Sequence, residues 1–395
     1  MADTARQSNR FLLLYALAWG GGAVAYVPFL TILLPVRVTL FAGQGADVVW
    51  LAYLAFAGAI AASVGHIGFG YLSDITRNRR GWILAGLVLS CALLPAISRA
   101  RDFRELLIVI VCWQLALNMM LAPLAALAGD CIPDAQKGRL GGLLAFAPGL
   151  GALSATLVTM PGVASADVRL VLVAVMVGCC VLPVLLLGNQ LPVLNPGPPL
   201  VEKNSPAPKG NDRVVLRMWL ARLAIQIAEA ALFAYLFFWF RTFNPAMSDS
   251  RTAGIFTIVL VLSAPIALIA GGWGDRVEKP HMPLVLCAAI SAIGLVGMAM
   301  APSLSVAIGT YALFGIATSV FLALHTAQTL RILPRPHRRG RDLGIFNLTN
   351  TVPSLVMPWL TIALVPWFGF SGLFLLFAGF ALVAAILVRS FDPTT

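Results

Sequence analysis

Long uncharged apolar runs, separated by short clusters of charged residues, constrain the fold of this chain more than any other feature. A helix of about 20 apolar residues crosses the hydrocarbon core of a bilayer, and most of the runs reach that length. Hydrophobic residues make up 59% of the 395 residues and charged residues 11%, whereas soluble domains carry roughly 25% charged residues. Because the mean hydropathy is also high, at +0.90, the sequence predicts a membrane protein and not an enzyme.

The runs predict twelve membrane-spanning helices. Two of them, Pro280–Leu330 and Leu343–Val388, have twice the length of one span and are broken near the middle by Pro302 and by Pro366–Gly369. Val214–Phe240 is the one predicted span that contains charged residues. No segment alternates polar and apolar residues as membrane strands do, so the predicted fold class is all-α. The other seven runs are Phe11–Val36, Val48–Ser73, Gly81–Ser98, Leu106–Gly129, Leu140–Ala166 and the runs that follow Arg169 and Arg251.

The distribution of Lys and Arg predicts a multi-pass protein of the cell (inner) membrane with both chain ends in the cytoplasm. With that orientation, 18 of the 27 Lys and Arg residues fall on the cytoplasmic side and seven on the opposite side. The same bias accounts for the net charge of +11, so no patch for nucleic acid is expected. The first ten residues are polar and no cleavage-site pattern ends the first run, so the first helix is expected to remain.

A Pro-rich polar stretch divides the spans six and six. Residues 190–213 are too poor in apolar side chains to pack and predict a cytoplasmic linker between halves at 1–189 and 214–395. This division prompts a search for an internal repeat.

Two landmarks recur in both halves. Gly70-Tyr-Leu-Ser-Asp74 ends the second span and Gly271-Gly-Trp-Gly-Asp275 ends the eighth, at an offset of 201. Gly138-Arg139 opens the fifth span and Gly340-Arg341 the eleventh, at an offset of 202. The chain is therefore predicted to be a duplicated six-helix unit, and parallel repeats of this kind place a substrate site near the membrane midplane between the halves.

This arrangement resembles the major facilitator superfamily over essentially the whole chain, because Gly-x-x-x-Asp is followed by basic residues after spans two and eight. The first copy departs from the family's loop pattern: Ile75 stands where an Arg usually follows the Asp, and Arg77 stands where a Gly is usual. The second copy keeps Asp275-Arg276. The resemblance implies the family's fold and transport by alternating access.

A finer resemblance connects the chain with the sucrose-transporter-like and glycoside-cation symporter branches. It lies in Leu34-Pro-Val-Arg37, Ser73–Arg80 and Gly340–Pro353. These branches imply a saccharide and a coupling cation. The second span lacks the intramembrane acidic pair that the sodium-coupled members use, so we expect H⁺ as the coupling ion, with no further cofactor and no metal.

The recurring Asp residues are predicted to form gates. Spans five and eleven begin at the cytoplasmic face, where positive helix N-termini attract a carboxylate. We expect Asp74 to pair with the start of span eleven near Arg341, and Asp275 with the start of span five near Arg139. The landmark glycines would permit close helix contact; ordinary solvated loop charge is the alternative. The predicted gate residues are Gly70, Asp74, Arg139, Gly271, Asp275, Arg276 and Arg341.

Span seven carries the most informative polar residues. Arg222, Gln226 and Glu229 are spaced four and three, which places them on one helical face. An ionisable group deep in a membrane is a functional candidate unless a partner satisfies it. We expect Glu229 to exchange a proton, with Arg222 tuning it; a static bridge between the two is the alternative. Histidines titrate near neutral pH, so His66 and His325 are possible members of a proton path or, alternatively, packing residues.

Polar and aromatic residues at helical spacing predict the lining of a substrate cavity. Aromatic faces beside amides suit a saccharide, because rings stack on its C–H faces and amides bond its hydroxyls. Interhelical hydrogen bonds and an interfacial aromatic belt are the alternatives. The predicted cavity residues are Gln226, Asn347, Asn350, Thr351, Ser354, Gln114, Asn118, Trp19 and Tyr26.

Together these features predict a proton-coupled secondary transporter of a small polar solute, with saccharide or glycoside uptake as the leading interpretation. Its expected partners are the solute and the lipid bilayer, and it is expected to function as a monomer. Ala147-Pro-Gly-Leu-Gly-Ala152 resembles, with Ala in two Gly positions, a motif of drug antiporters. A proton-driven exporter is therefore the alternative, and a non-transporting membrane sensor is a third interpretation, because fold does not fix function.

Overall fold

The computed structural model of the protein describes residues 6–41, 47–160, 165–188, 212–247, 249–277, 279, 281–333 and 339–389. Every regular element within these ranges is a helix, which confirms the all-α class. Ten helices in the described ranges are long and apolar enough to cross a membrane. The other two predicted spans are also helical, in α9 (Asp212–Phe243) and in the first part of α13 (Arg339–Arg389). The linker predicted at 190–213 lies outside the described residues except for its last two.

The chain forms two compact units, and each unit takes one short segment from the opposite half of the sequence. The first unit contains residues 1–133, 146–208 and 335–347, and the second contains 134–145, 209–334 and 348–395. The predicted boundaries at 189 and 214 do not include this exchange, in which Gly138 and Gly340 pack against the landmark of the other repeat.

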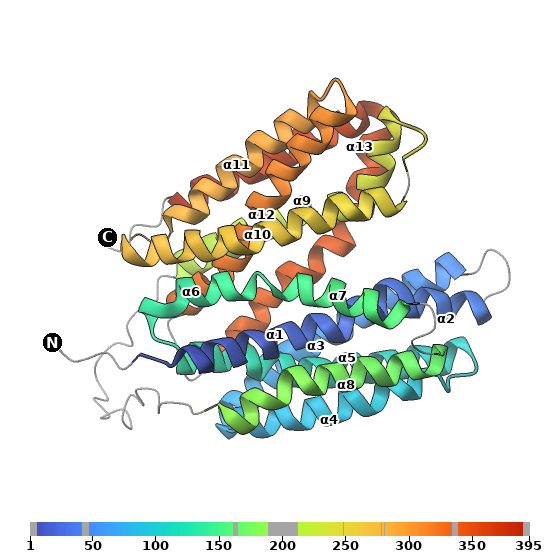
Figure 1. Ribbon diagram of the computed structural model, residues 1–395, viewed down its shortest axis with the longest axis vertical. Coiled ribbons are helices and arrows are strands. Elements are labelled where there is room, and N and C mark those ends of the chain that lie inside the picture. The colour runs from blue at the N-terminus through green and yellow to red at the C-terminus, as the bar shows by residue number, and fades with distance from the viewer. Residues whose placement is uncertain are drawn as a thin grey trace. The chain divides into compact units, whose positions relative to one another are not determined.

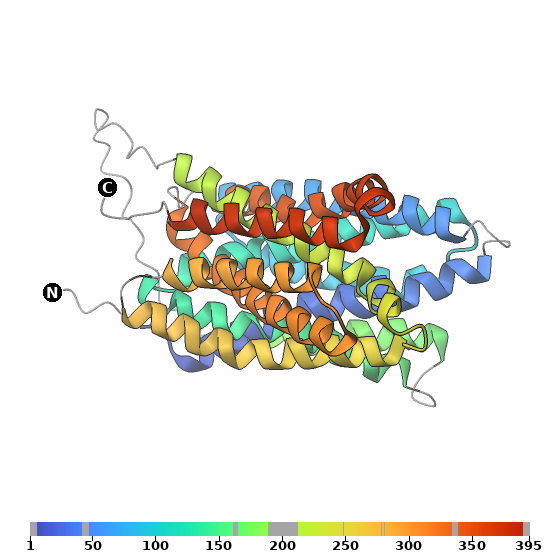
Figure 2. The same ribbon diagram turned by 90° about the horizontal axis from the view of Figure 1, so that it is seen from above.

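The first unit is a bundle of antiparallel helices, drawn from blue to green in Figures 1 and 2. Helix α5 packs on α3 and α4, and α1 packs on α7 and α8. Small residues permit close approach, as in other membrane bundles: a Cβ on Gly86 would overlap the backbone of Met120. Its elements are α1 (Asn9–Pro28), η1 (Phe29–Leu33), α2 (Leu34–Phe41), α3 (Asp47–Thr76), α4 (Arg79–Ile97), α5 (Phe103–Cys131), α7 (Ala147–Thr159) and α8 (Ala166–Leu187).

The second unit is built in the same way around α12. Helix α12 packs on α6, α9, α10 and α11. An aromatic group joins three of its helices: Trp239 lies edge-on to Phe374 at 4.8 Å between ring centroids, and Phe240 lies edge-on to Tyr311 at 5.9 Å. Its elements are α6 (Asp134–Leu144), α9, α10 (Asp249–Arg276), α11 (Met282–Ala299), α12 (Leu304–Ile332) and most of α13.

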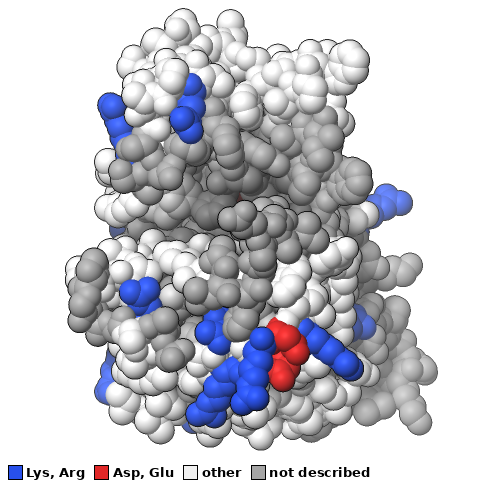
Figure 3. Space-filling view, turned by 90° about the vertical axis from the view of Figure 1, so that its right-hand side faces the viewer, with Lys and Arg blue, Asp and Glu red and all other residues white. Residues whose placement is uncertain are grey.

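Polar side chains fix several helix starts. Asp102 accepts a hydrogen bond from the backbone N–H of Glu105 at 2.8 Å, and the Glu105 carboxylate accepts one from the N–H of Arg101 at 2.9 Å. Such reciprocal caps satisfy N–H groups that have no partner within the helix. Arg37 of α2 donates to the carbonyls of Ser98 and Ala100, at the end of α4. On the end face in Figure 3, basic side chains lie in small groups, one of them beside an acidic group.

The helices are interrupted at the strongest helix-breaking residues of the sequence. Pro302 lies between α11 and α12, and Gly369 interrupts α13 with a φ of 62°. Both predicted breaks are therefore present, and α11 packs on α12 as the first predicted hairpin requires. The run predicted at Leu140–Ala166 is instead divided into α6 and α7, because the chain turns before Pro148, whose ring fits the first turn of a new helix. A π-helical segment, which the sequence pattern did not predict, follows Pro28.

Candidate functional site

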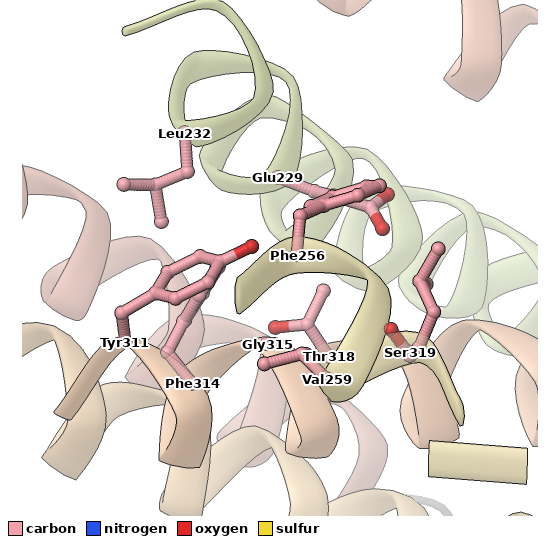
Figure 4. A pocket seen from close by; sticks show the side chains of 10 residues that line it. Glu229, Leu232, Phe256, Val259, Tyr311, Phe314, Gly315, Thr318 and Ser319 are labelled. Carbon is pink, nitrogen blue, oxygen red and sulfur yellow. The ribbon is translucent and has the colours of Figure 1, made fainter. Parts of the chain in front are cut away.

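Glu229 lies on α9 and lines a small pocket of about 20 Å³, which has room for roughly one water molecule. Figure 4 shows Phe256 and Val259 of α10 and Tyr311 of α12 around the same space, with the Tyr311 hydroxyl directed towards α9. Among the described residues, the Glu229 carboxylate has neither a hydrogen bond nor an ion pair within 4.0 Å. A partly exposed carboxylate in this setting can take up a proton or meet a ligand without first breaking a bond.

Arg222 lies two turns before Glu229 and binds neutral groups of α12 and α13. Its Nε donates to Thr349 Oγ1 at 3.1 Å. Its Nη1 donates to the Leu322 carbonyl and to Thr326 Oγ1, both at 3.2 Å. No Arg222–Glu229 ion pair within 4.0 Å is present among the salt bridges of the described residues. The predicted alternative of a static bridge is therefore wrong, because hydrogen bonds to α12 and α13 hold the guanidinium.

His325 also lies beside Arg222, and we call the groups of α12 and α13 that contact the guanidinium its shell. It is fully buried, and its Nε2 lies 3.0 Å from the Met218 carbonyl. Since a carbonyl only accepts, Nε2 carries the proton and donates it. The remaining nitrogen, Nδ1, then presents its lone pair to Arg222 Nη1 at 3.5 Å. His325 thus acts as a neutral acceptor that orients the guanidinium.

The exposed edge of this shell is formed by two amides. Gln226 Nε2 donates to Asn350 Oδ1 at 2.6 Å, and Arg222 Nη2 donates to the same oxygen at 3.4 Å. The structure thus brings together three predicted residues from α9 and α13. Thr351 is bonded to the Leu348 carbonyl at 3.3 Å, Asn347 is half-buried in the first unit, and the side chain of Ser354 lies outside the described residues.

Most predicted polar residues of the first unit form a buried interhelical contact. His66 Nδ1 and Asn118 Oδ1 lie 2.9 Å apart between α3 and α5, and Asn118 Nδ2 donates to the Gln114 carbonyl at 2.8 Å. All three side chains are buried. This is the arrangement of the predicted alternative, so we do not place Gln114 and Asn118 in a cavity. Trp19 is half-buried and Tyr26 is 42% exposed.

In the first unit, Asp74 binds the start of α13. Its carboxylate accepts from the backbone N–H groups of Gly340 and Arg341 at 3.0 and 3.1 Å and pairs with Arg79 at 2.5 Å. A Cβ on Gly70 would overlap the Gly340 carbonyl. The structure therefore forms the predicted contact between Asp74, its landmark glycine and the N-terminus of span eleven. We call this group the Asp74 lock.

In the second unit, Asp275 binds α6. Its carboxylate accepts from the backbone N–H of Arg139 at 3.1 Å and pairs with Arg331 at 2.5 Å. A Cβ on Gly271 would overlap the Gly138 carbonyl. One detail differs from the prediction: α6 begins at Asp134, so Asp275 meets its second turn and not its first. We call this group the Asp275 lock; Arg276 is exposed beside it.

The sequence patterns missed the ion pairs that support both locks. Asp130, at the end of α5, pairs with Arg79 at 3.1 Å and with Arg339 at 2.8 Å. Arg331, at the end of α12, pairs with Asp275. Asp130 and Arg331 lie at the repeat offset of 201. The repeat offset was the sequence signal that could have pointed to these two ion-pairing residues, although they carry opposite charges.

Comparisons with known proteins agree with this architecture. The sequence profile of the Major Facilitator Superfamily matches residues 218–395. Over this second part of its length the chain is similar to that family. No curated protein matches the sequence.

Solved structures with the major facilitator fold cover nearly the whole chain. The human organic anion transporter TETRAN has a TM-score of 0.74 at 14% identity, covering 96% of this chain and 99% of that one. The fucose:proton symporter FucP of E. coli has 0.71 at 17%, and a bacterial homologue of the iron transporter ferroportin has 0.70 at 16%; each alignment covers 96% of this chain and 98% of the other. These likenesses show the fold of both halves.

Proposed function

We propose that the protein is a proton-coupled symporter of a small polar solute with sugar-like chemistry, and that Glu229 carries the proton. The observation that carries the proposal is the position of Glu229: it lines a pocket in the second unit and has neither a hydrogen bond nor an ion pair in the described chain. A membrane-embedded carboxylate without a partner is a functional candidate by default. The fold likeness to a fucose:proton symporter supports the same class of reaction.

The two locks act as gates in this proposal. Each lock joins the end of one span to a segment whose chain continues into the other unit, since 134–145 precedes α7 and 335–347 precedes the rest of α13. Alternating access requires contacts that form in one state and break in the other. We place the locks and both chain ends at the cytoplasmic face of the inner membrane, because most Lys and Arg residues gather on that side. We also propose that one chain transports alone.

Uptake into proteoliposomes tests the proton role. With an inward proton gradient, the unmodified protein should accumulate a transported sugar, and a protonophore should abolish that accumulation. Glu229→Gln should lower accumulation at least tenfold and keep exchange of labelled for unlabelled solute, because exchange needs no net proton movement. Glu105→Gln is the matched control, since Glu105 only caps α5. Accumulation by Glu229→Gln at the level of the unmodified protein would contradict the proposal.

The interruption of span five favours export as the second candidate function. The chain turns at Ala145–Phe146, directly before the Ala147-Pro-Gly segment that resembles the antiporter motif. An exporter would drive solute against the proton gradient. Reversing the imposed gradient in the same vesicles separates the two, because symport moves solute with the protons and antiport moves it against them.

A further inference from the structure

Among the described residues, no acidic side chain lies within salt-bridge distance of the positively charged Arg222. Its described hydrogen-bond partners on α12 and α13 are hydroxyls, an amide, a backbone carbonyl and a neutral histidine. No Asp or Glu of the described chain forms a salt bridge with it. A charge inside a membrane protein is costly unless a partner or ligand compensates it.

The exposed edge of this shell presents donors. The guanidinium has five N–H groups, and the bonds to side-chain oxygens and the Leu322 carbonyl use four, which leaves one on Nη2. Gln226 uses one N–H of its amide on Asn350 and keeps the other. Two donors, one of them charged, suit an oxyanion better than a sugar hydroxyl, since charge-assisted hydrogen bonds are about twice as strong as neutral ones.

We propose that Arg222 and Gln226 bind a carboxylate of the solute, so that the transported compound is a small organic anion such as a sugar acid and not a neutral sugar. This inference rests on the proposed function and narrows its substrate class. The shell of α12 and α13 holds the guanidinium in place, so a ligand would meet a preorganised group.

Glu229 gives this site a dependence on protonation. It lies seven residues from Arg222 on the same helix, about 10 Å along the axis. An ionised Glu229 repels a bound carboxylate, and a protonated Glu229 does not. The other titratable groups nearby, both on α12, are His325, whose Nε2 bonds the Met218 carbonyl and whose Nδ1 faces Arg222, and the Tyr311 phenol. The pocket residues of α10 are apolar. Proton and anion therefore favour each other's binding, and by linkage the effect is reciprocal.

Matched solutes test the inference on the unmodified protein. Glucuronate against glucose, and galacturonate against galactose, are matched pairs that differ in the carboxylate at C6. We expect the acids to raise the melting temperature and to exchange across proteoliposomes, with affinity at least tenfold above that of the neutral sugars. The affinity for the acid should rise as the pH falls, and Glu229→Gln should remove that dependence.

Substitutions of Arg222 test whether this residue causes the preference for the acid. Arg222→Gln should lose the preference for the acid, whereas Arg222→Lys should keep part of it because the charge remains without the planar fork. Arg213→Gln, at the exposed start of the same helix, should change nothing. The melting temperature of each ligand-free variant shows whether that variant is folded. If Arg222→Gln does not fold, the comparison of acids with neutral sugars on the unmodified protein still tests the inference.

The outcomes separate this inference from the proposed function. If neutral sugars and sugar acids bind equally and both accumulate with protons, symport stands and the anion site is overturned. If the acids bind through Arg222 but never accumulate with protons, the anion site stands and proton symport fails. An affinity for the acid that is the same at every pH in the unmodified protein overturns the coupling between Arg222 and Glu229.

Discussion

Arg77 is the one non-glycine residue of the described chain with a positive φ, at 52°. It stands where the superfamily usually has Gly, between α3 and α4. Left-handed backbone costs a residue with a Cβ about 1 kcal/mol, and glycine avoids that cost. We therefore expect Arg77→Gly to raise the free energy of unfolding by about 1 kcal/mol, measured by denaturation in detergent micelles.

Arg77→Ala is the control for this prediction, because it removes the same exposed side chain and keeps the Cβ. If the Gly and Ala variants are equally stable, the backbone at position 77 is not strained. The departure from the family pattern was visible in the sequence, but its cost depends on a backbone angle that the residue name alone does not give.

The sequence could not predict which residues Arg222 and Glu229 contact in the second unit, and the reason is different from that at Arg77. The spacing of Arg222, Gln226 and Glu229 correctly placed them on one helix face, because helical periodicity is local. Which neighbours they meet depends on the rotation of α12 and α13, and this rotation gives Arg222 its neutral shell and leaves Glu229 beside the pocket.

At the scale of elements, the landmark glycines set how closely two pairs of segments approach. A Cβ at position 70 would overlap the Gly340 carbonyl, and one at 271 would overlap the Gly138 carbonyl. Gly70→Ala and Gly271→Ala should each lower the free energy of unfolding by about 1–3 kcal/mol, because the backbones cannot approach as closely. Thermal unfolding in detergent measures the loss.

The chain supplies matched controls for these substitutions. A Cβ at Gly68 or at Gly272 would meet no atom within 4 Å, so Ala at either position should leave stability unchanged or raise it slightly. Equal effects at positions 271 and 272 would mean that close packing against the Gly138 carbonyl does not decide the effect.

The sequence predicted the helix boundaries correctly where a helix-breaking residue lies near the middle of a run that has twice the length of one span. Pro302 and Gly369 divide the two long runs as predicted, since both residues break helical geometry locally. The turn before Pro148 and the π-helical segment after Pro28 lie inside runs that are apolar throughout. Hydropathy carries no signal there, because a kinked helix and a straight one bury the same kinds of side chain.

At the scale of the whole molecule, the repeat offset identified two locks that the structure places in separate compact units. The locks share no residue, and each Asp accepts backbone N–H bonds and pairs with an Arg. Asp74→Asn and Asp275→Asn should therefore each reduce the free energy of unfolding by about 1–3 kcal/mol. The first leaves Arg79 with Asp130 as its one carboxylate partner among the described residues, and the second removes the carboxylate that pairs with Arg331.

The double variant tests whether the locks are independent. Contacts without shared partners usually give additive effects, to within about 0.5 kcal/mol. The double variant should therefore lose the sum of the two single losses in detergent denaturation. Glu105→Gln is the control, because its side chain is exposed and forms no salt bridge among the described residues, and Gln can keep the capping hydrogen bond. A double variant no less stable than the weaker single variant would show that the two locks open as one cooperative structure and not as separate contacts.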